Sequence, residues 1–249
     1  MPTALAPDLE IVIPVYNEGA NILSVLRSLA EHVRTPFRVL IAFDHDDDDT
    51  LVAIDAEPTS IEIVRVKNRG QGAFGAVMTG FAESKAPYVL VFPADDDYNA
   101  PRIDALVARA RAGAEIVAAS RFMPGGTMVG APALKAVLIR TSAFALFHLA
   151  RIPTHDPSNG LRLFSRRVLQ TIRVESTIGF TYSIELLVKA HRLGWPIEEV
   201  PFTWYERKAG KSRFHAVKWA PAYLRWFFYG FATTWLGRGP ESVPLELQV

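Results

Sequence analysis

The chain has 249 residues, of which 49% are hydrophobic and 21% charged, and its formal net charge is +1. This size suits one α/β domain with a substantial core, and the near-zero net charge supplies no field that would steer the protein to nucleic acid. The chain contains no cysteine, which excludes disulfides, thiol catalysis and cysteine–zinc sites.

Strands and helices alternate through the first half of the chain. Apolar, β-branched runs predict strands at 9–16, 37–43, 61–67, 88–92 and 114–122. Apolar residues at helical spacing predict helices at 17–33, 68–84 and 101–113. This alternation predicts a Rossmann-like α/β fold, doubly wound, with a mostly parallel sheet. Ligands of such sheets bind at the carboxyl ends of the strands.

After residue 122 the pattern changes. The next segments read as a flexible loop at 123–132, an apolar helix at 133–152, a turn, strand and helix start at 155–169, a helix at 182–194, a strand at 196–204 and a basic loop at 205–214. An aromatic tail follows. Residues 133–150 and 217–236 combine apolar and aromatic side chains with Lys and Arg, which suits the interface of a membrane. The alternative is that both segments pack on the core or in a dimer contact.

Three polar segments follow predicted strands and should therefore meet at one edge of the sheet. The sequence Asp95-Asp96-Asp97 comes directly after the strand at 88–92. Carboxylates one residue apart, such as Asp95 and Asp97, can hold a magnesium or manganese ion while a diphosphate fills other coordination positions. The alternative is a solvated acidic turn that caps the following helix.

The other two segments are the acidic turn at 44–50 and the glycine-rich loop that begins at 69. Asp44 and Asp48 are the better candidates in the acidic turn for hydrogen bonds to a base or ribose, and the alternative is a charged surface loop. Gly72 lies among glycines that permit close backbone approach, ahead of a helix whose free N–H groups can face phosphate. A plain loop-to-helix junction is the alternative there.

Basic residues are candidates for contact with phosphate groups. A flexible basic loop could close over a phosphate-bearing substrate, or be a solvated surface loop, and it contains Arg207, Lys208, Lys211 and Arg213. Further cations are Arg121, Arg162, Arg166 and Arg167. Arg121 is the favoured one of these, because it closes a strand at the edge where the other candidates gather.

The motifs together resemble family 2 glycosyltransferases of GT-A fold, and within them the polyprenyl-phosphate sugar transferases similar to dolichyl-phosphate mannosyltransferase. The resemblance covers about residues 9–214. It is carried, in order, by "IVIPVYNE", "RGQGAFGAVMTGF", "FPADDDYNAP", "ASRF", "DPSNGLRLF", "GFTYSIELLVKAHRLGWPIEEVPFTW" and "RKAGKSRF".

The resemblance implies an inverting hexosyltransferase with a GDP- or UDP-linked sugar as donor, a polyprenyl phosphate as acceptor, and Mg²⁺ or Mn²⁺ as cofactor. The residues that it implies at the nucleotide are Pro14, Tyr16 and Glu18, with Asp44 near the base and Gly72 in the glycine-rich loop. Asp95 and Asp97 would hold the metal. The implied phosphate contacts are Arg121, Arg207, Lys211, Ser212 and Arg213.

The resemblance also implies a division of the chain. Residues 1–214 would form the GT-A domain, with a nucleotide-binding half at about 9–122 and an acceptor half at about 123–214. Residues 215–249 would be an aromatic C-terminal tail. We expect a cytoplasmic protein, peripheral at the inner face of the membrane, that contacts the membrane through 133–150 and 217–236. Expected partners are the nucleotide sugar, the lipid phosphate, and a homo-oligomer or membrane partner protein, with no nucleic acid.

The chain departs from the family pattern at three places. Pro93 stands where the family commonly has the first carboxylate of Asp-x-Asp, so that Asp96 and Asp97 compensate or the metal is held differently. Phe43 and His45 alter the acidic turn, and Asn159 replaces a usual serine. Two other hypotheses stay open: a transferase with a soluble or glycan acceptor, and a non-catalytic nucleotide-sugar-binding protein of the same fold.

Overall fold

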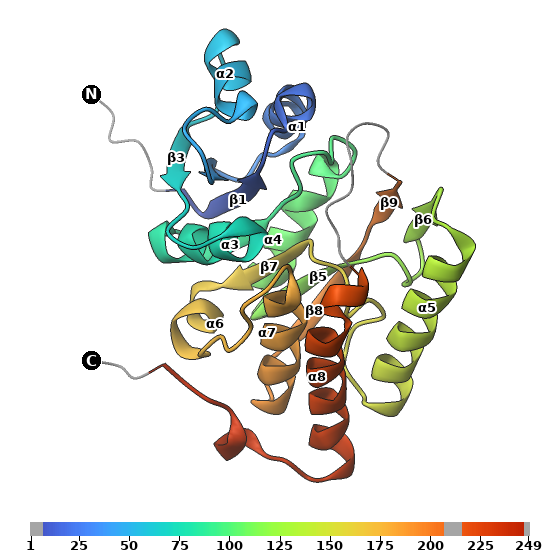
Figure 1. Ribbon diagram of the computed structural model, residues 1–249. Coiled ribbons are helices and arrows are strands. Elements are labelled where there is room, and N and C mark those ends of the chain that lie inside the picture. Colours follow the sequence, from blue (N-terminus) through green and yellow to red (C-terminus); the bar gives the residue numbers. More distant parts are fainter. Residues whose placement is uncertain (1–6, 207–215, 247–249) are drawn as a thin grey trace.

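A mixed, mostly parallel sheet organises the protein, whose computed structural model describes residues 7–206 and 216–246 (Figure 1). Its 7 strands have the order β3-β2-β1-β4-β7-β5-β8. Their bounds are β1 Leu9–Val15, β2 Phe37–Phe43, β3 Ile63–Lys67, β4 Tyr88–Val91, β5 Ile116–Ser120, β7 Arg162–Ser165 and β8 Ile197–Pro201. A second sheet pairs β6 Thr127–Val129 with β9 Thr203–Tyr205. The predicted α/β class with a mostly parallel sheet is confirmed.

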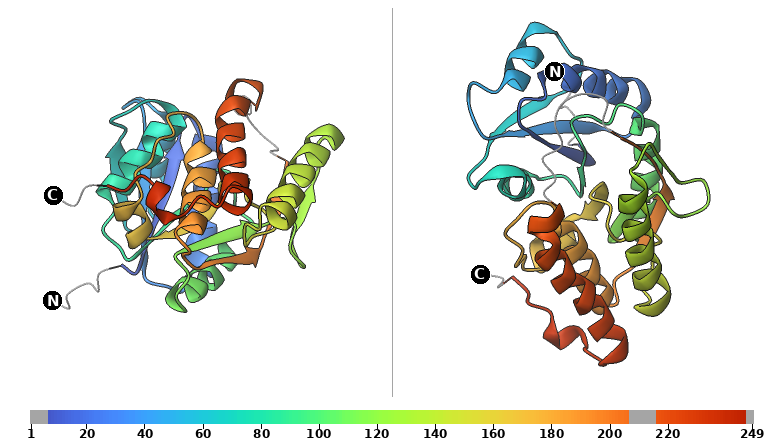
Figure 2. Two further views of the ribbon diagram at one scale, coloured as in Figure 1. Left: turned by 90° about the horizontal axis from the view of Figure 1, so that it is seen from below. Right: turned by 45° about the vertical axis from the view of Figure 1, so that its right-hand side comes forward.

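Helices cover both faces of the large sheet. They are α1 Gly19–His32, α2 Asp49–Ala56, α3 Gly72–Glu83, α4 Ile103–Arg111, α5 Ala133–Phe144, α6 Arg166–Thr171, α7 Thr181–Arg192 and α8 Ala216–Trp235. Short helical turns span Ala100–Arg102, Ala145–Leu149 and Pro240–Ser242. α5 and α8 lie at the end of the molecule away from α1 and α2 (Figure 2).

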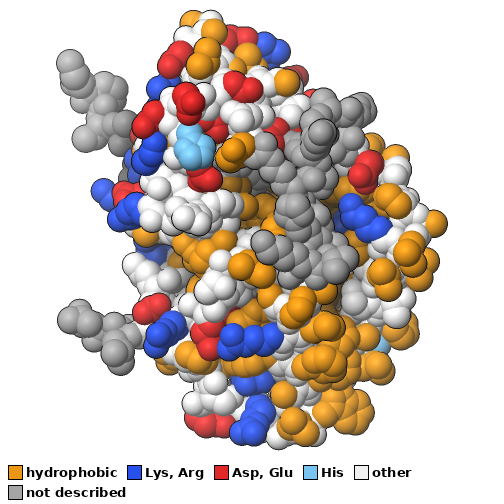
Figure 3. All heavy atoms as spheres, in the orientation of Figure 1, with side chains coloured by type: hydrophobic (Ala, Val, Ile, Leu, Met, Phe, Trp, Pro, Cys, Tyr) orange, Lys and Arg blue, Asp and Glu red, His pale blue; other side chains and the backbone are white. Residues whose placement is uncertain are grey.

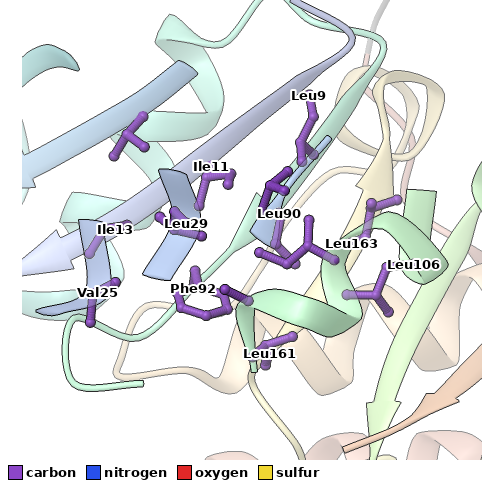
Figure 4. Close-up of a cluster of buried hydrophobic side chains, with 14 of the residues drawn as sticks. Leu9, Ile11, Ile13, Val25, Leu29, Leu90, Phe92, Leu106, Leu161 and Leu163 are labelled. Carbon is purple, nitrogen blue, oxygen red and sulfur yellow. The ribbon is translucent and has the colours of Figure 1, made fainter. Parts of the chain in front are cut away.

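Each sheet face has its own core. On one face, alternate residues of β1 pack with the apolar sides of α1 and α4, as the side chains of Ile11, Leu29 and Leu106 show in Figure 4. On the other face, residues such as Val12 of β1 pack with Ala76 of α3, and a further cluster joins α3 to α7 and α8. This alternation along β1 is what a strand between two helical layers requires.

The structure differs from the expectations at three elements. β7 runs antiparallel between β4 and β5, so β5 does not pair with β4 as a continuous parallel sheet would require. Residues 49–56 form a helix where only an acidic turn was expected, because Leu51 and Ile54 give it a short apolar side. The loop expected at 123–132 contains β6, which pairs with β9.

The C-terminal segment packs against the domain. The indole of Trp226 on α8 is 1% exposed, and its Nε1 donates to Ser176 Oγ at 2.9 Å. On α7, the fully buried Lys189 pairs with Glu185 at 2.6 Å and with Glu175 at 2.9 Å. In the described part of the chain, no helix combines the length and the apolar character needed to cross a bilayer.

Candidate functional site

The loops that follow β1 and β2 are joined by hydrogen bonds at the carboxyl edge of the sheet. The backbone N–H of Asn17 donates to Asp48 Oδ2 at 3.0 Å, and that of Glu18 donates to Thr50 Oγ1 at 2.9 Å. Gly19 N–H donates to Asp49 Oδ1 at 2.8 Å. These hydrogen bonds place the residues after β1 beside the acidic turn after β2.

Asp48 has a structural role in this junction. Its side chain is almost fully buried, and its Oδ1 accepts from Thr50 N–H at 2.9 Å as the N-cap of α2. Its Oδ2 accepts from Asn17 N–H. Because both oxygens serve the protein's own backbone, the expectation that Asp48 faces a nucleotide is not supported.

Asn68 joins the acidic turn to the glycine-rich loop. Its Nδ2 donates to Asp44 Oδ1 at 2.5 Å and to Gly72 O at 3.2 Å. Its Oδ1 accepts from Gly70 N–H at 2.8 Å. The sequence analysis missed this residue, and its only signal was an asparagine between a strand and a glycine-rich turn.

The glycines of this loop have different roles. A Cβ on Gly75 would lie 2.8 Å from the Cα of Gly70, so these two allow the loop and α3 to approach each other. Gly72 opens α3 with φ +59°, and a Cβ there would meet nothing within 4 Å. The Gln71 side chain makes no capping hydrogen bond to α3, so within the described part of the chain the first N–H groups of this helix are open to a ligand.

Tyr16 directly follows β1 and lies at the surface of this edge of the sheet. Its side chain is 40% exposed and contacts the His45 ring edge-on, with centroids 5.9 Å apart. Pro14 and Glu18 are half-buried beside it, and Asp44 is half-buried in the next loop. The residues predicted at the nucleotide thus lie on two neighbouring loops, although their contact with a nucleotide stays a prediction.

The three aspartates after β4 have different environments. Asp95 is exposed, whereas Asp96 points inward and accepts from Tyr98 N–H at 3.2 Å and Asn99 N–H at 3.0 Å. Asn99 Nδ2 also donates to both Asp96 oxygens. Burial raises the pKa of Asp96 to about 6, although these hydrogen bonds act to lower it. Asp96 is therefore part of the turn, which disfavours it as the substitute for the carboxylate absent at Pro93.

Asp95 and Asp97 remain as the candidate metal ligands. The Asp97 carboxylate is half-buried and accepts no hydrogen bond from the described residues, while its backbone O accepts from Ser28 Oγ at 2.7 Å. Carboxylate oxygens are the donors that Mg²⁺ and Mn²⁺ prefer, so the chemistry of this pair fits such an ion. Among the described residues, no group of three or more histidine and acidic side chains is placed to hold a metal.

Arg121 is held in a buried ion pair. The residue is 8% exposed, and its Nε and Nη2 donate to the two oxygens of Asp156 at 2.6 and 2.8 Å. Nη2 also donates to Ser158 Oγ at 3.0 Å. Most of the guanidinium is thus engaged by the protein, and Nη1 is the nitrogen that makes no hydrogen bond to the described residues. Contact with phosphate stays a prediction for Arg121.

The remaining predicted residues are placed as follows. Asn159 supports the chain, since its Nδ2 donates to Ala119 O at 2.7 Å and its Oδ1 accepts from Leu161 N–H. The predicted phosphate contacts in the basic loop lie outside the described residues, and they are Arg207, Lys211, Ser212 and Arg213.

Comparisons of sequence identify relatives of the chain. Residues 10–173 match the model of glycosyl transferase family 2. Polyprenol monophosphomannose synthase of Mycolicibacterium smegmatis is 30% identical over 213 residues, which are 82% of this chain and 79% of that protein. Undecaprenyl-phosphate mannosyltransferase of Micrococcus luteus is 26% identical over 234 residues, covering 91% of this chain and 95% of that protein.

Comparison of structures agrees on the fold. Glucosyl-3-phosphoglycerate synthase from Mycobacterium tuberculosis, solved with Mn²⁺, uridine diphosphate and glucosyl-3-phosphoglycerate, superposes with a TM-score of 0.64 at 20% identity. The match covers 92% of this chain and 80% of that one. At this identity, the likeness establishes the fold alone.

The junction at Asn68 leads to a first prediction. Asn68→Ala removes the hydrogen bonds to Asp44, Gly70 and Gly72, so we expect the free energy of unfolding to fall by about 1–3 kcal/mol in urea denaturation. Gln71→Ala is the matched control, because Gln71 is exposed and makes no capping hydrogen bond. Equal stability of the two variants would contradict the linking role of Asn68.

Proposed function

The chain belongs to glycosyl transferase family 2, and we propose that it transfers a hexose from a nucleotide-diphosphate sugar to a polyprenyl phosphate. The observation that carries this proposal is the meeting of three loops at one sheet edge, where Tyr16, Asp44 and the Asp95–Asp97 segment follow β1, β2 and β4. The acceptor is proposed from the two relatives that the chain matches over most of their length, whose names specify polyprenyl phosphates.

The proposed donor site uses both neighbouring loops. The pair of rings formed by Tyr16 and His45 offers an apolar surface to a nucleobase, and Asp44 offers acceptors to its N–H groups or to ribose hydroxyls. The open N-terminus of α3 at Gly72 faces the diphosphate with N–H groups. Both UDP and GDP sugars suit these contacts.

In the proposed reaction, an oxygen of the acceptor phosphate attacks the anomeric carbon while the bond from that carbon to the donor diphosphate breaks. The configuration inverts, and the nucleoside diphosphate leaves. The acceptor oxygen is already anionic, so the chain needs no strong general base and contributes mainly by positioning the two substrates. A magnesium or manganese ion held by Asp95 and Asp97 would supply positive charge to the departing diphosphate.

A membrane surface forms the second part of the proposal. Hydrophobic side chains that are at least 48% exposed lie on α5, on the helical turn that follows it, on α8 and just after α8, and they are Leu134, Val137, Leu138, Phe144, Leu149, Leu224, Phe228, Trp235 and Leu236. Hydrophobic side chains gather over α8 and α5 at the lower right of Figure 3. The two elements are joined, because Trp235 Nε1 donates to Leu149 O at 2.9 Å and Thr234 Oγ1 to Ala150 O at 2.7 Å.

We propose that this surface rests on the cytoplasmic face of a bilayer, where the lipid acceptor is found. Lys135, Arg140 and Arg225 lie on the same two helices. Lys135 pairs with Glu206 and Arg225 with Glu175, whereas Arg140 suits anionic head groups. The expected division into a nucleotide half, an acceptor half and a C-terminal tail also remains a proposal, with α8 packed on the acceptor half.

The metal pair gives the second prediction. We expect Asp95→Asn and Asp97→Asn each to lower kcat/KM at least about 100-fold, because each removes one carboxylate that would hold the ion beside the leaving group. Transfer is measured by mass spectrometry of lipid-linked product, with farnesyl phosphate, Mn²⁺ or Mg²⁺, and a panel of UDP and GDP sugars.

Asp47→Asn serves as the control, because Asp47 is an exposed acidic residue of the neighbouring loop. Full activity in Asp95→Asn would refute the assignment of the metal pair. Release of nucleoside diphosphate without lipid product would instead point to another acceptor. Nucleotide binding with no release from any donor would contradict the enzyme assignment.

The membrane surface gives the third prediction. The double variant Leu138→Asp, Phe228→Asp places charge on two side chains that are 62% and 63% exposed. We expect its binding to vesicles of phosphatidylcholine and phosphatidylglycerol to fall at least about 5-fold, since aspartate resists burial in the bilayer boundary. Val52→Asp is the control, because Val52 is 66% exposed on the distant α2. Unchanged binding of the double variant in a flotation assay would reject this surface.

A further inference from the structure

Two buried guanidinium groups lie near one buried carboxylate beside the candidate site. Asp156 is fully buried and is paired with Arg121. Arg162 is also fully buried, and its Nη1 donates to Ser183 O at 2.5 Å. Its Nη2 donates to the backbone oxygens of Asp156 and Pro157 at 3.4 and 3.3 Å. None of these hydrogen bonds of Arg162 ends on a carboxylate.

Arg162 lies at the same sheet edge as the aspartates. It begins β7, where it stands opposite Val91 at the end of β4 and opposite Ala118 of β5. The chain continues from Val91 to the aspartate triplet and from Ala118 to Arg121. The buried cation is therefore placed between the predicted metal pair and the predicted phosphate contact.

The cluster of Arg121, Asp156 and Arg162 keeps a net positive charge at neutral pH. The pKa of Arg162 is lowered to about 10, mainly by burial and in smaller part by the charge of Arg121, while the charge of Asp156 opposes the shift. Arg162 therefore keeps its proton near pH 7. With Arg121 also charged, two positive groups face the single negative charge of Asp156, and the three residues carry a net charge of about +1.

Two phenols lie near the charge of Arg162. Arg162 Nε and the Tyr182 hydroxyl are buried without a hydrogen-bond partner among the described protein atoms. Burial raises the pKa of Tyr182, and it raises that of Tyr223 to about 12, so both phenols are neutral at pH 7. A buried positive charge among unpaired donors costs free energy, and an anion alongside it would offset that cost.

We propose that one phosphate group completes this cluster at Arg121, and that Arg162 is a positioning residue which makes Arg121 receptive to it through Asp156. Arg162 adds a second positive charge beside the Asp156–Arg121 pair, so the single negative charge of Asp156 leaves the cluster positive. Arg121 then presents Nη1 as a charged donor. Arg162 itself is fully buried and does not touch the phosphate.

The phosphate can come from the lipid acceptor or from the donor diphosphate, and this inference rests on the proposed function. Isothermal titration calorimetry on the full chain separates the two sources, with farnesyl phosphate as one probe and UDP and GDP with Mg²⁺ as the other. Arg162→Met removes the charge at similar length, and Arg162→Lys keeps it. Arg34→Met is the control for the loss of one positive charge, because Arg34 is exposed before β2.

For Arg162→Met we expect a dissociation constant at least about 10-fold weaker for one probe, and that probe identifies the source. Arg162→Lys should stay within about 3-fold of the wild type, and Arg34→Met should be unchanged. A folded Arg162→Met that binds both probes as the wild type does would overturn the proposal. Equal losses in the Lys and Met variants would also overturn it, since shape and not charge would then matter.

If Arg162→Met does not fold, the wild type decides the question. Inorganic pyrophosphate without metal should raise its melting temperature, whereas sodium chloride at the same ionic strength should not, and a failure to do so would overturn the proposal. These binding and melting measurements do not require the protein to transfer a sugar. A wild type that binds farnesyl phosphate but transfers no sugar would therefore reject the proposed function and leave this inference standing.

Discussion

The hydrogen bonds of Asn68 and Asp48 hold three loops together, and the rest of the site depends on them. Asp44 would otherwise repel its acidic neighbours, and the glycine-rich loop has few side chains of its own with which to fix its path. Asn68 satisfies Asp44 and shapes the turn before α3. Asp48 starts α2 and at the same time fixes the loop after β1. Hydrogen bonds to the nearby backbone thus fix the positions of the polar groups that would face a ligand.

The sheet edge separates opposite charges along its length. Carboxylates gather after β2 and β4, whereas Arg121 and Arg162 lie at β5 and β7. The antiparallel β7 produces this separation, since it inserts between β4 and β5 and brings the start of a strand to the edge where the others end. A donor diphosphate with its metal suits the first side, and an anionic acceptor suits the second.

Much of this arrangement could be predicted from the sequence. Long apolar runs predicted the parallel strands, and the ends of these strands predicted the edge of the sheet at which Tyr16, Asp44 and Asp95 lie. The insertion of β7 depends on pairings between distant segments, which local patterns do not encode. The burial of Arg121 depends on Asp156, 35 residues away along the chain. The roles of Asp95, Asp96 and Asp97 could not be separated either, because identical side chains differ only in which way the turn points them.

The most direct test of this account is anomalous diffraction from crystals grown with Mn²⁺ and either UDP or GDP. The account predicts a manganese peak beside Asp95 and Asp97, a base near Tyr16 and Asp44, and a diphosphate that faces the start of α3. A nucleotide bound at another edge of the sheet, or a manganese ion bound away from this pair of aspartates, would contradict it.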